Sequence, residues 1–267
     1  AFVPGYGSLD AVPAFMSLAA VLCRVRRRLW LAGLLLGCGV LVKFYPLILL
    51  PFLMYERRRL LWAPALACAG LVAAGMGVSF LLWGESTLNP ILLAQDRPGA
   101  MLSIFRVIAA HPEISRALFG AADVSWASIY LMGLAGGTVW AVAAWRNLPV
   151  VEASMLGFLA VLTSYKVGNQ QFLLTFVLLA AYSVASVSRV SRVTFRPLFG
   201  VLIYLLFLEG FQVLYVFTRW LSPPWNAALD FLGLPTFVLA LIAMTTGLLF
   251  MEAGRDDKTA SPGPRPP

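Results

Sequence analysis

The stretch VLVKFYPLILLP, residues 40–51, places a single lysine in the middle of a long apolar run. Mostly apolar residues precede Lys43 back to Leu29 and follow it as far as Tyr55. A lysine inside a membrane costs about 2.5–3.5 kcal/mol on insertion scales, so its side chain needs a partner or a way to water. The path of residues 29–55 therefore decides how the chain folds and where this charge lies.

The composition of the whole chain is that of a membrane protein. Of its 267 residues, 60% are hydrophobic and 12% are charged, and the mean hydropathy is +0.84. In a soluble domain about a quarter of the residues are charged. The apolar runs do not alternate with period two, so they are predicted to be helices rather than barrel strands. The predicted fold is all-α, a polytopic transmembrane helical bundle, with apolar segments at 9–23, 29–55, 60–83, 126–145, 150–165, 172–187, 197–220 and 231–250.

Basic residues decide between two paths for residues 29–55, which form either one tilted span or a hairpin that enters and leaves on the same side. The hairpin places 14 Lys and Arg residues on the cytoplasmic side and 5 outside, whereas the single span places 9 inside and 10 outside. Only the hairpin obeys the positive-inside rule. It predicts a multi-pass protein of the plasma membrane, with a transmembrane domain at 1–250, an outer loop at 84–125 and a disordered cytoplasmic C-terminal tail at 251–267.

The two arms of this hairpin are too short to cross a bilayer. Residues 29–42 rise about 21 Å as a helix and residues 44–55 about 18 Å, against a hydrocarbon core of about 30 Å. The apex KFYP is therefore predicted to lie in the outer half of the membrane, between short, broken, re-entrant helices. The residues that suit a broken and closely packed hairpin are Pro46, Pro51, Gly33, Gly37 and Gly39.

Two interpretations of Lys43 follow from this depth. Lys43 either pairs with a buried carboxylate such as Glu209 or snorkels outward, or its ammonium meets an anionic group of a ligand at the outer leaflet. A lipid-linked phosphate is the natural ligand of this kind. Tyr45 either adds a hydroxyl donor or is an interfacial aromatic side chain. Glu209 and Gln212 lie one helical turn apart, so they share a face of segment 197–220.

Residues 5–62 resemble polytopic glycosyltransferases of the GT-C superfamily, and most closely the family-87 mannosyltransferase-like group. The similar features follow in order: a GSLD turn at 7–10 that opens a helix, a basic loop, a glycine-rich helix, KFYP at 43–46, and a second basic cluster before a tryptophan. The group often has Gln at the position of Ser8. The stretch SYKVGNQQFLLTF, 164–176, is similar to a polar patch before a late helix in such enzymes, with Asn169 in place of the usual proline.

This resemblance implies an enzyme that transfers a sugar, mannose in this group, from a polyprenyl-phosphate donor to a lipid or glycan acceptor at the extracytoplasmic face. A carboxylate base deprotonates the acceptor hydroxyl, which attacks the anomeric carbon with inversion, while basic residues stabilise the phosphate leaving group. Some branches depend on a metal, so a divalent cation is left open. The catalytic Asp usually lies in a first outer loop, so we expect the main base upstream of Ala1 and the chain to be an N-terminally truncated fragment.

Within the chain, Asp10 is the weak candidate for a base. It lies at the outer end of the first segment, on the same predicted side as Lys43, where it would contact sugar hydroxyls or cap its helix. The stretch KVGNQQ, 166–171, lies between two short apolar segments and is expected either to line a polar cavity or to form an ordinary outer turn. The substrate contacts predicted in this stretch are Lys166, Asn169, Gln170 and Gln171, whose amides suit sugar hydroxyls.

The outer loop mixes apolar residues with single arginines at 101–110 and 113–120, as interfacial helices do. Arg106 is predicted to contact phosphate or lipid headgroups there. No metal site is predicted, because His111 is the only histidine and the cysteines have no metal-ligand spacing; these are Cys23, Cys38 and Cys68. The net charge of +8 is interpreted as a topology signal, so the predicted partners are membrane lipids and not nucleic acid.

Two other functions compete with the enzyme. A transporter or lipid flippase predicts two similar halves with matching broken helices, whereas KFYP occurs once. A non-catalytic membrane subunit of an envelope-glycan complex predicts that Lys43 and Asp10 can be replaced without loss of activity. Nothing in the sequence matches a nucleotide-phosphate loop or a Ser-His-Asp order, so the chemistry of soluble enzymes has no support.

Overall fold

The computed structural model describes residues 8–56, 59–89, 103–120, 126–166, 170–186 and 233–250. Most of these residues are helical, which confirms the predicted helical class. Two short strands, β1 (Tyr55–Glu56) and β2 (Arg59–Leu60), pair antiparallel. The helices are α1 (Ser8–Val25), α2 (Leu29–Val42), η1 (Tyr45–Leu49), α3 (Leu50–Met54), α4 (Trp62–Trp83), η2 (Gly84–Leu88), α6 (Ile104–Ala110), α7 (Pro112–Phe119), α8 (Ala127–Arg146), α9 (Val150–Ser164), α10 (Gln170–Ser186) and α13 (Gly233–Phe250).

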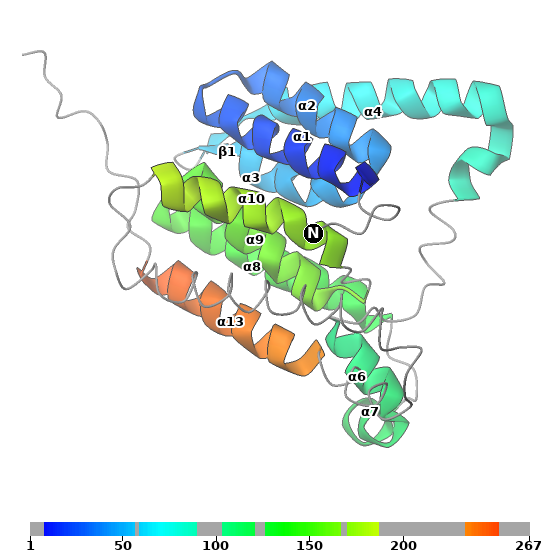
Figure 1. Cartoon of the computed structure of the whole chain (residues 1–267), viewed down its shortest axis with the longest axis vertical. Coiled ribbons are helices and arrows are strands. Elements are labelled where there is room, and N and C mark those ends of the chain that lie inside the picture. The colour runs from blue at the N-terminus through cyan, green and yellow to red at the C-terminus, as the bar shows by residue number, and fades with distance from the viewer. Residues whose placement is uncertain are drawn as a thin grey trace, which may run out of the picture.

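The helices pack as two groups, one from each half of the chain (Figure 1). In the first group α2 lies between α1 and α4, and α3 returns beneath them. In the second group α9 packs against α8, α10 and α13. The two groups meet where α1 contacts α10 and where α3 contacts α9. The later part of α4 extends beyond the bundle (Figure 1).

Helix α9 is the centre of this packing. Every residue from Val151 to Ser164 is buried, as expected for a helix that is apolar on all sides. Gly157 faces the ring of Phe52 from α3, and a Cβ at this position would overlap that ring. The close approach of α3 to α9 therefore depends on a glycine.

The hairpin path of residues 29–55 is confirmed. Helix α2 ends at Lys43, whose backbone is extended (φ −152°, ψ 139°), and η1 and α3 run back from there. Arg27 precedes α2 and Glu56 follows α3, yet Arg27 Nη2 lies 2.7 Å from Glu56 Oε1. The segment therefore leaves and returns at the same end of the bundle, with its break at KFYP.

Glycines in α2 allow the close packing that the sequence predicts. A Cβ on Gly33 would overlap the carbonyl oxygen of Pro64 in α4. A Cβ on Gly37 would come within 3.2 Å of Leu71, also in α4. The faces of α2 and α4 thus meet with little more than backbone between them.

Two stretches, Trp62–Leu88 and Ala127–Arg146, are long and apolar enough to cross a membrane. Other apolar helices in the described part of the chain, such as Val150–Ser164, are shorter. These lengths and compositions support a membrane protein, while the full set of spans and their orientation stay predictions. Segment 197–220, with Glu209 and Gln212, and the tail 251–267 lie outside the described residues.

The segment 84–125, which is predicted to be an outer loop, contains short helices where the sequence predicts them. Helices α6 and α7 occupy the stretches 101–110 and 113–120 in large part. Ser103 caps α6, because its Oγ accepts a hydrogen bond of 3.2 Å from the backbone N–H of Phe105. His111 lies between the two helices, with its Nδ1 3.1 Å from Glu113 Oε1.

Candidate functional site

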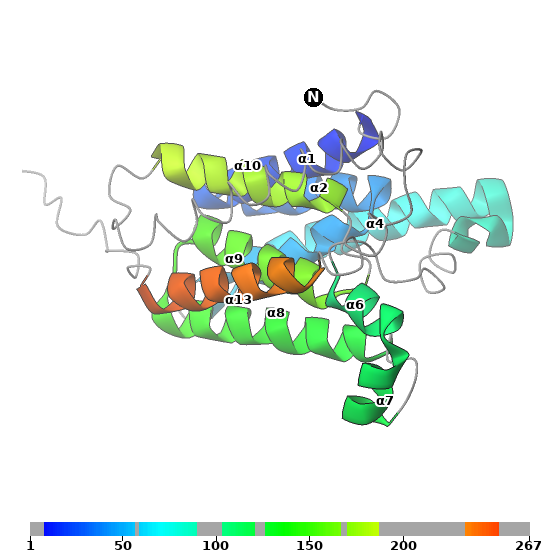
Figure 2. The same ribbon diagram turned by 60° about the horizontal axis from the view of Figure 1, so that its bottom comes forward.

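Four helix ends that carry predicted site residues lie on one side of the bundle. They are the start of α1, the end of α2, the end of α9 and the start of α10 (Figures 1 and 2). Helices α1, α2 and α3 alternate in direction, and so do α8, α9 and α10, which brings these ends together. We call this side the Lys43 end, and the opposite side, where α1 ends and α9 begins, the Arg24 end.

Lys43 lies half-buried at the break of the hairpin. Its backbone N–H donates to the carbonyl oxygen of Gly39 at 2.9 Å, which closes the last turn of α2. The C-terminal end of a helix carries a partial negative charge, so a lysine is favourable there. The position of the Lys43 charge is thus set by the end of α2 and by the proline-containing start of η1.

Tyr45 opens η1, and its side chain points into the core. It is 8% exposed, and its ring meets that of Phe158 from α9 edge to face, with the ring centroids 5.8 Å apart. Packing of this kind accounts for a buried aromatic side chain without a ligand. The predicted contact of the Tyr45 hydroxyl with substrate stays a prediction.

Asp10 lies in the first described turn of α1, where the helix dipole favours a carboxylate. Lys166 lies half-buried two residues beyond the end of α9. Gln170 and Gln171 open α10, and their side chains are outside the described part of the structure. Asn169 lies outside the described residues. The fold thus brings predicted site residues of α1, α2 and α10 together at the Lys43 end.

Arg106 is the third residue of α6, and its side chain is likewise not described. Helix α6 packs against α13 and lies at the Lys43 end (Figure 2). No group of three or more His, Cys, Asp or Glu residues gathers anywhere in the described ranges.

A family model described as glycosyltransferase family 87 matches residues 4–165, more than half of the chain. The chain belongs to glycosyltransferase family 87. The match includes the helix break at Lys43 and the whole of α9, and it ends just before Lys166. The predicted contacts from Lys166 to Gln171 therefore lie beyond the matched region.

This family-87 chain is 30% identical over 160 residues to the "Polyprenol-phosphate-mannose-dependent alpha-(1-2)-phosphatidylinositol pentamannoside mannosyltransferase" of Mycolicibacterium smegmatis (strain ATCC 700084 / mc(2)155). The aligned part is 58% of this chain and 37% of the relative. The chain thus spans well under two thirds of the relative's length. No solved structure matches it.

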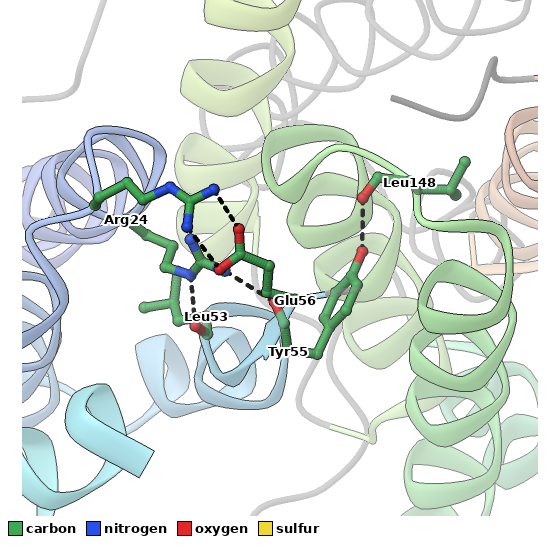
Figure 3. Close-up of polar contacts among 6 residues, drawn as sticks. Arg24, Leu53, Tyr55, Glu56 and Leu148 are labelled. Carbon is green, nitrogen blue, oxygen red and sulfur yellow. Dashed lines mark hydrogen bonds and ion pairs between the residues drawn. The ribbon is translucent and has the colours of Figure 1, made fainter. Parts of the chain in front are cut away.

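At the Arg24 end, the family-87 chain has a polar network that the sequence analysis missed (Figure 3). Arg24 is 4% exposed; its Nε–H donates to the carbonyl oxygen of Leu53 at 2.9 Å and its Nη2 to that of Tyr55 at 3.0 Å. Arg24 Nη2 also lies 3.6 Å from Glu56 Oε2. Arg24 is buried because α3 ends against α1. The pattern of charges in the sequence does not reveal this contact between the two helices.

The same network continues to α9 through the Tyr55 hydroxyl, which donates to the carbonyl oxygen of Leu148 at 2.7 Å (Figure 3). Tyr55 is 3% exposed, so this bond satisfies a buried hydroxyl. This bond ties the end of the hairpin to the turn between α8 and α9.

Glu152 is a second buried group that sequence reasoning overlooked. It is 9% exposed, and its Oε1 accepts a hydrogen bond of 2.9 Å from the hydroxyl of Ser183 in α10. Its Oε2 has no hydrogen-bond partner among the described residues. The sequence could have indicated Glu152, because a carboxylate within an apolar segment such as 150–165 is expected to have a specific role.

Proposed function

We propose that this chain forms part of a GT-C-type membrane glycosyltransferase. The enzyme transfers mannose from a polyprenyl-phosphate donor to a lipid or glycan acceptor at the extracytoplasmic face. Membership of family 87 supports sugar transfer, and the dependence of the Mycolicibacterium smegmatis relative on polyprenol-phosphate-mannose supports the donor. The observation that carries the proposal is the helix break at Lys43, which lies at the same bundle end as Asp10 and Lys166.

The face of action follows from the two ends of the bundle. Arginines 24 and 26–28, together with Arg59 and Arg146, lie at the Arg24 end, as expected for the cytoplasmic side. The Lys43 end then faces the outer leaflet. A lipid-linked phosphate would present its negative charge to Lys43 at about the depth of this break.

In the proposed reaction, an acceptor hydroxyl oxygen forms a bond to the anomeric carbon as the bond from that carbon to the phosphate oxygen breaks. The ammonium groups of Lys43 and Lys166 stabilise the negative charge that stays on the phosphate. A carboxylate takes the hydroxyl proton, and Asp10 is the candidate within this chain. The amides of Asn169, Gln170 and the adjacent glutamine hold the sugar hydroxyls.

Replacement of Lys43 tests this proposal. The full-length gene product is reconstituted in liposomes with radiolabelled polyprenyl-phosphate mannose, and transfer by the parent is compared with transfer by Lys43→Ala. Loss of a group that stabilises the leaving charge is expected to lower kcat by about a hundredfold or more. Lys43→Arg, which keeps the charge, is expected to retain more activity than Lys43→Ala.

Arg116→Gln is the matched control, because it removes an exposed positive charge from α7 without touching the hairpin. Its transfer rate is expected to stay within twofold of the parent. Equal transfer by Lys43→Ala and the parent would remove Lys43 from the mechanism and favour the non-catalytic subunit. If the parent transfers no sugar from any lipid-linked donor, the transporter or flippase becomes the better proposal.

A further inference from the structure

The Arg24 end carries a basic and aromatic surface for which the proposed transfer reaction has no use. Its exposed side chains come from the turn between α1 and α2, the start of α2, the β1–β2 hairpin and the start of α4. We call it the Arg–Trp surface, and it consists of Arg26, Arg27, Arg28, Trp30, Arg59 and Trp62.

Glu56 joins the two loops that build this surface. It pairs with Arg27 from the α1–α2 turn at 2.7 Å, and it lies opposite Arg59 in the antiparallel register of β1 and β2. Glu56 is the one carboxylate that the described part of these loops contributes, and it is already engaged with Arg24 and Arg27. The charge of the described side chains on this surface is therefore strongly positive.

Arg27 occupies a backbone position that normally favours glycine. Its φ is +60°, in the left-handed region. The N–H of Arg28 donates to the carbonyl oxygen of Cys23 at 2.8 Å, and the N–H of Arg27 donates to that of Arg24 at 3.0 Å. These two bonds form a Schellman motif, in which the left-handed residue is usually glycine. The side chain that this conformation positions is the one that pairs with Glu56.

Two tryptophans flank the arginines. Trp30 is 59% exposed in the first turn of α2, and Trp62 is 61% exposed at the first residue of α4. Tryptophan favours the level of the lipid headgroups, where its ring meets acyl chains and its N–H meets water. Arginine presents a planar fork of donors that matches two oxygens of a phosphate. The surface thus combines an anchor for the membrane interface with donors for phosphate.

We propose that the Arg–Trp surface binds the phosphate headgroups of anionic phospholipids in the leaflet that covers the Arg24 end. Arg26, Arg28 and Arg59 supply the phosphate contacts, while Trp30 and Trp62 fix the depth of the surface in the membrane. Each arginine near an anionic leaflet is expected to strengthen lipid association by about fivefold. The inference rests on insertion of the chain in a membrane and not on sugar transfer.

Quenching by brominated lipids tests this surface, because its own tryptophans report on adjacent lipid. The full-length gene product is placed in nanodiscs that contain equal fractions of brominated phosphatidylglycerol or brominated phosphatidylcholine. The difference in quenching between the parent and a Trp30→Phe, Trp62→Phe variant isolates the signal of the surface. The test variant combines Arg26→Gln, Arg28→Gln and Arg59→Gln, and the control is Arg116→Gln at the other end.

The parent is expected to prefer phosphatidylglycerol, and the triple variant is expected to lose at least threefold of that preference. Arg116→Gln is expected to keep the parental value. A smaller loss in the triple variant, or a parent without preference, overturns the proposal. Should the triple variant fail to fold, the parent alone decides: its preference must weaken between 0.1 and 0.5 M salt, and a constant preference overturns the proposal. A sugar-transfer assay on the same samples separates this outcome from failure of the proposed function.

Discussion

At the scale of single residues, Arg24 holds the end of the hairpin against α1. Its guanidinium is buried and satisfies the carbonyl oxygens of Leu53 and Tyr55. Arg24→Met removes both bonds and leaves two buried acceptors unpaired, so we expect a loss of about 3 kcal/mol in the free energy of unfolding. Titration with SDS in mixed micelles measures this loss through the helical circular dichroism.

Arg26→Met is the control for Arg24→Met, because Arg26 is two residues away and exposed. It is expected to change the free energy of unfolding by no more than about 0.5 kcal/mol. Similar losses in the two variants would show that the bonds of Arg24 contribute nothing specific. The sequence presents both residues as members of one basic loop, and only the fold separates the structural arginine from the exposed one.

At the scale of elements, most helix positions follow from the sequence, since segments 60–83, 126–145 and 150–165 coincide closely with α4, α8 and α9. The lengths of apolar segments and the basic residues between them are local features of the sequence, so they predict helix boundaries well. The sequence did not predict that α9 lies at the centre of the bundle. A helix with apolar residues on every face has the same sequence pattern whether it contacts lipid or protein. The sequence did not show how Tyr45 packs, because its neighbour Phe158 is far away in sequence.

The contact between α3 and α9 gives a prediction at this scale. Gly157→Ala places a methyl group on the ring of Phe52, which is 2% exposed and has little room to move. Overpacking costs about 1–3 kcal/mol, which exceeds the gain of about 1 kcal/mol from replacing a helical glycine. We expect lower stability in the same SDS titration, and partial recovery when Phe52→Leu is added.

Gly137→Ala in α8 is the matched control, since a Cβ there meets nothing within 4 Å. It is expected to leave stability unchanged or to raise it by up to about 1 kcal/mol. Equal destabilisation by Gly137→Ala and Gly157→Ala would mean that glycine is needed for helix flexibility rather than for the approach of α3. The comparison therefore separates local helix energetics from packing between elements.

At the scale of the whole molecule, the fold places two sets of polar groups at opposite ends of the bundle. The Lys43 end collects a helix break and polar helix termini, whereas the Arg24 end collects the arginines and the hydrogen bonds that close the hairpin. The count of basic residues was enough to predict that 29–55 turns back to the end at which it starts, because a single span would have placed nearly equal numbers of basic residues on the two sides. It was not enough to show the bonds to Leu53, Tyr55 and Leu148 that hold this path.

Cysteine labelling tests the orientation of these two ends in the membrane. In a background with Cys23, Cys38 and Cys68 replaced by alanine, single cysteines are introduced by Arg28→Cys, Arg59→Cys and Pro112→Cys, all at exposed positions. A membrane-impermeant maleimide is expected to label Pro112→Cys in intact cells. It is expected to label Arg28→Cys and Arg59→Cys only after permeabilisation, because the hairpin keeps both on the cytoplasmic side. Labelling of Arg28→Cys and Arg59→Cys from opposite sides would contradict the hairpin in the membrane, and labelling of both in intact cells would invert the orientation and with it the proposed face of sugar transfer.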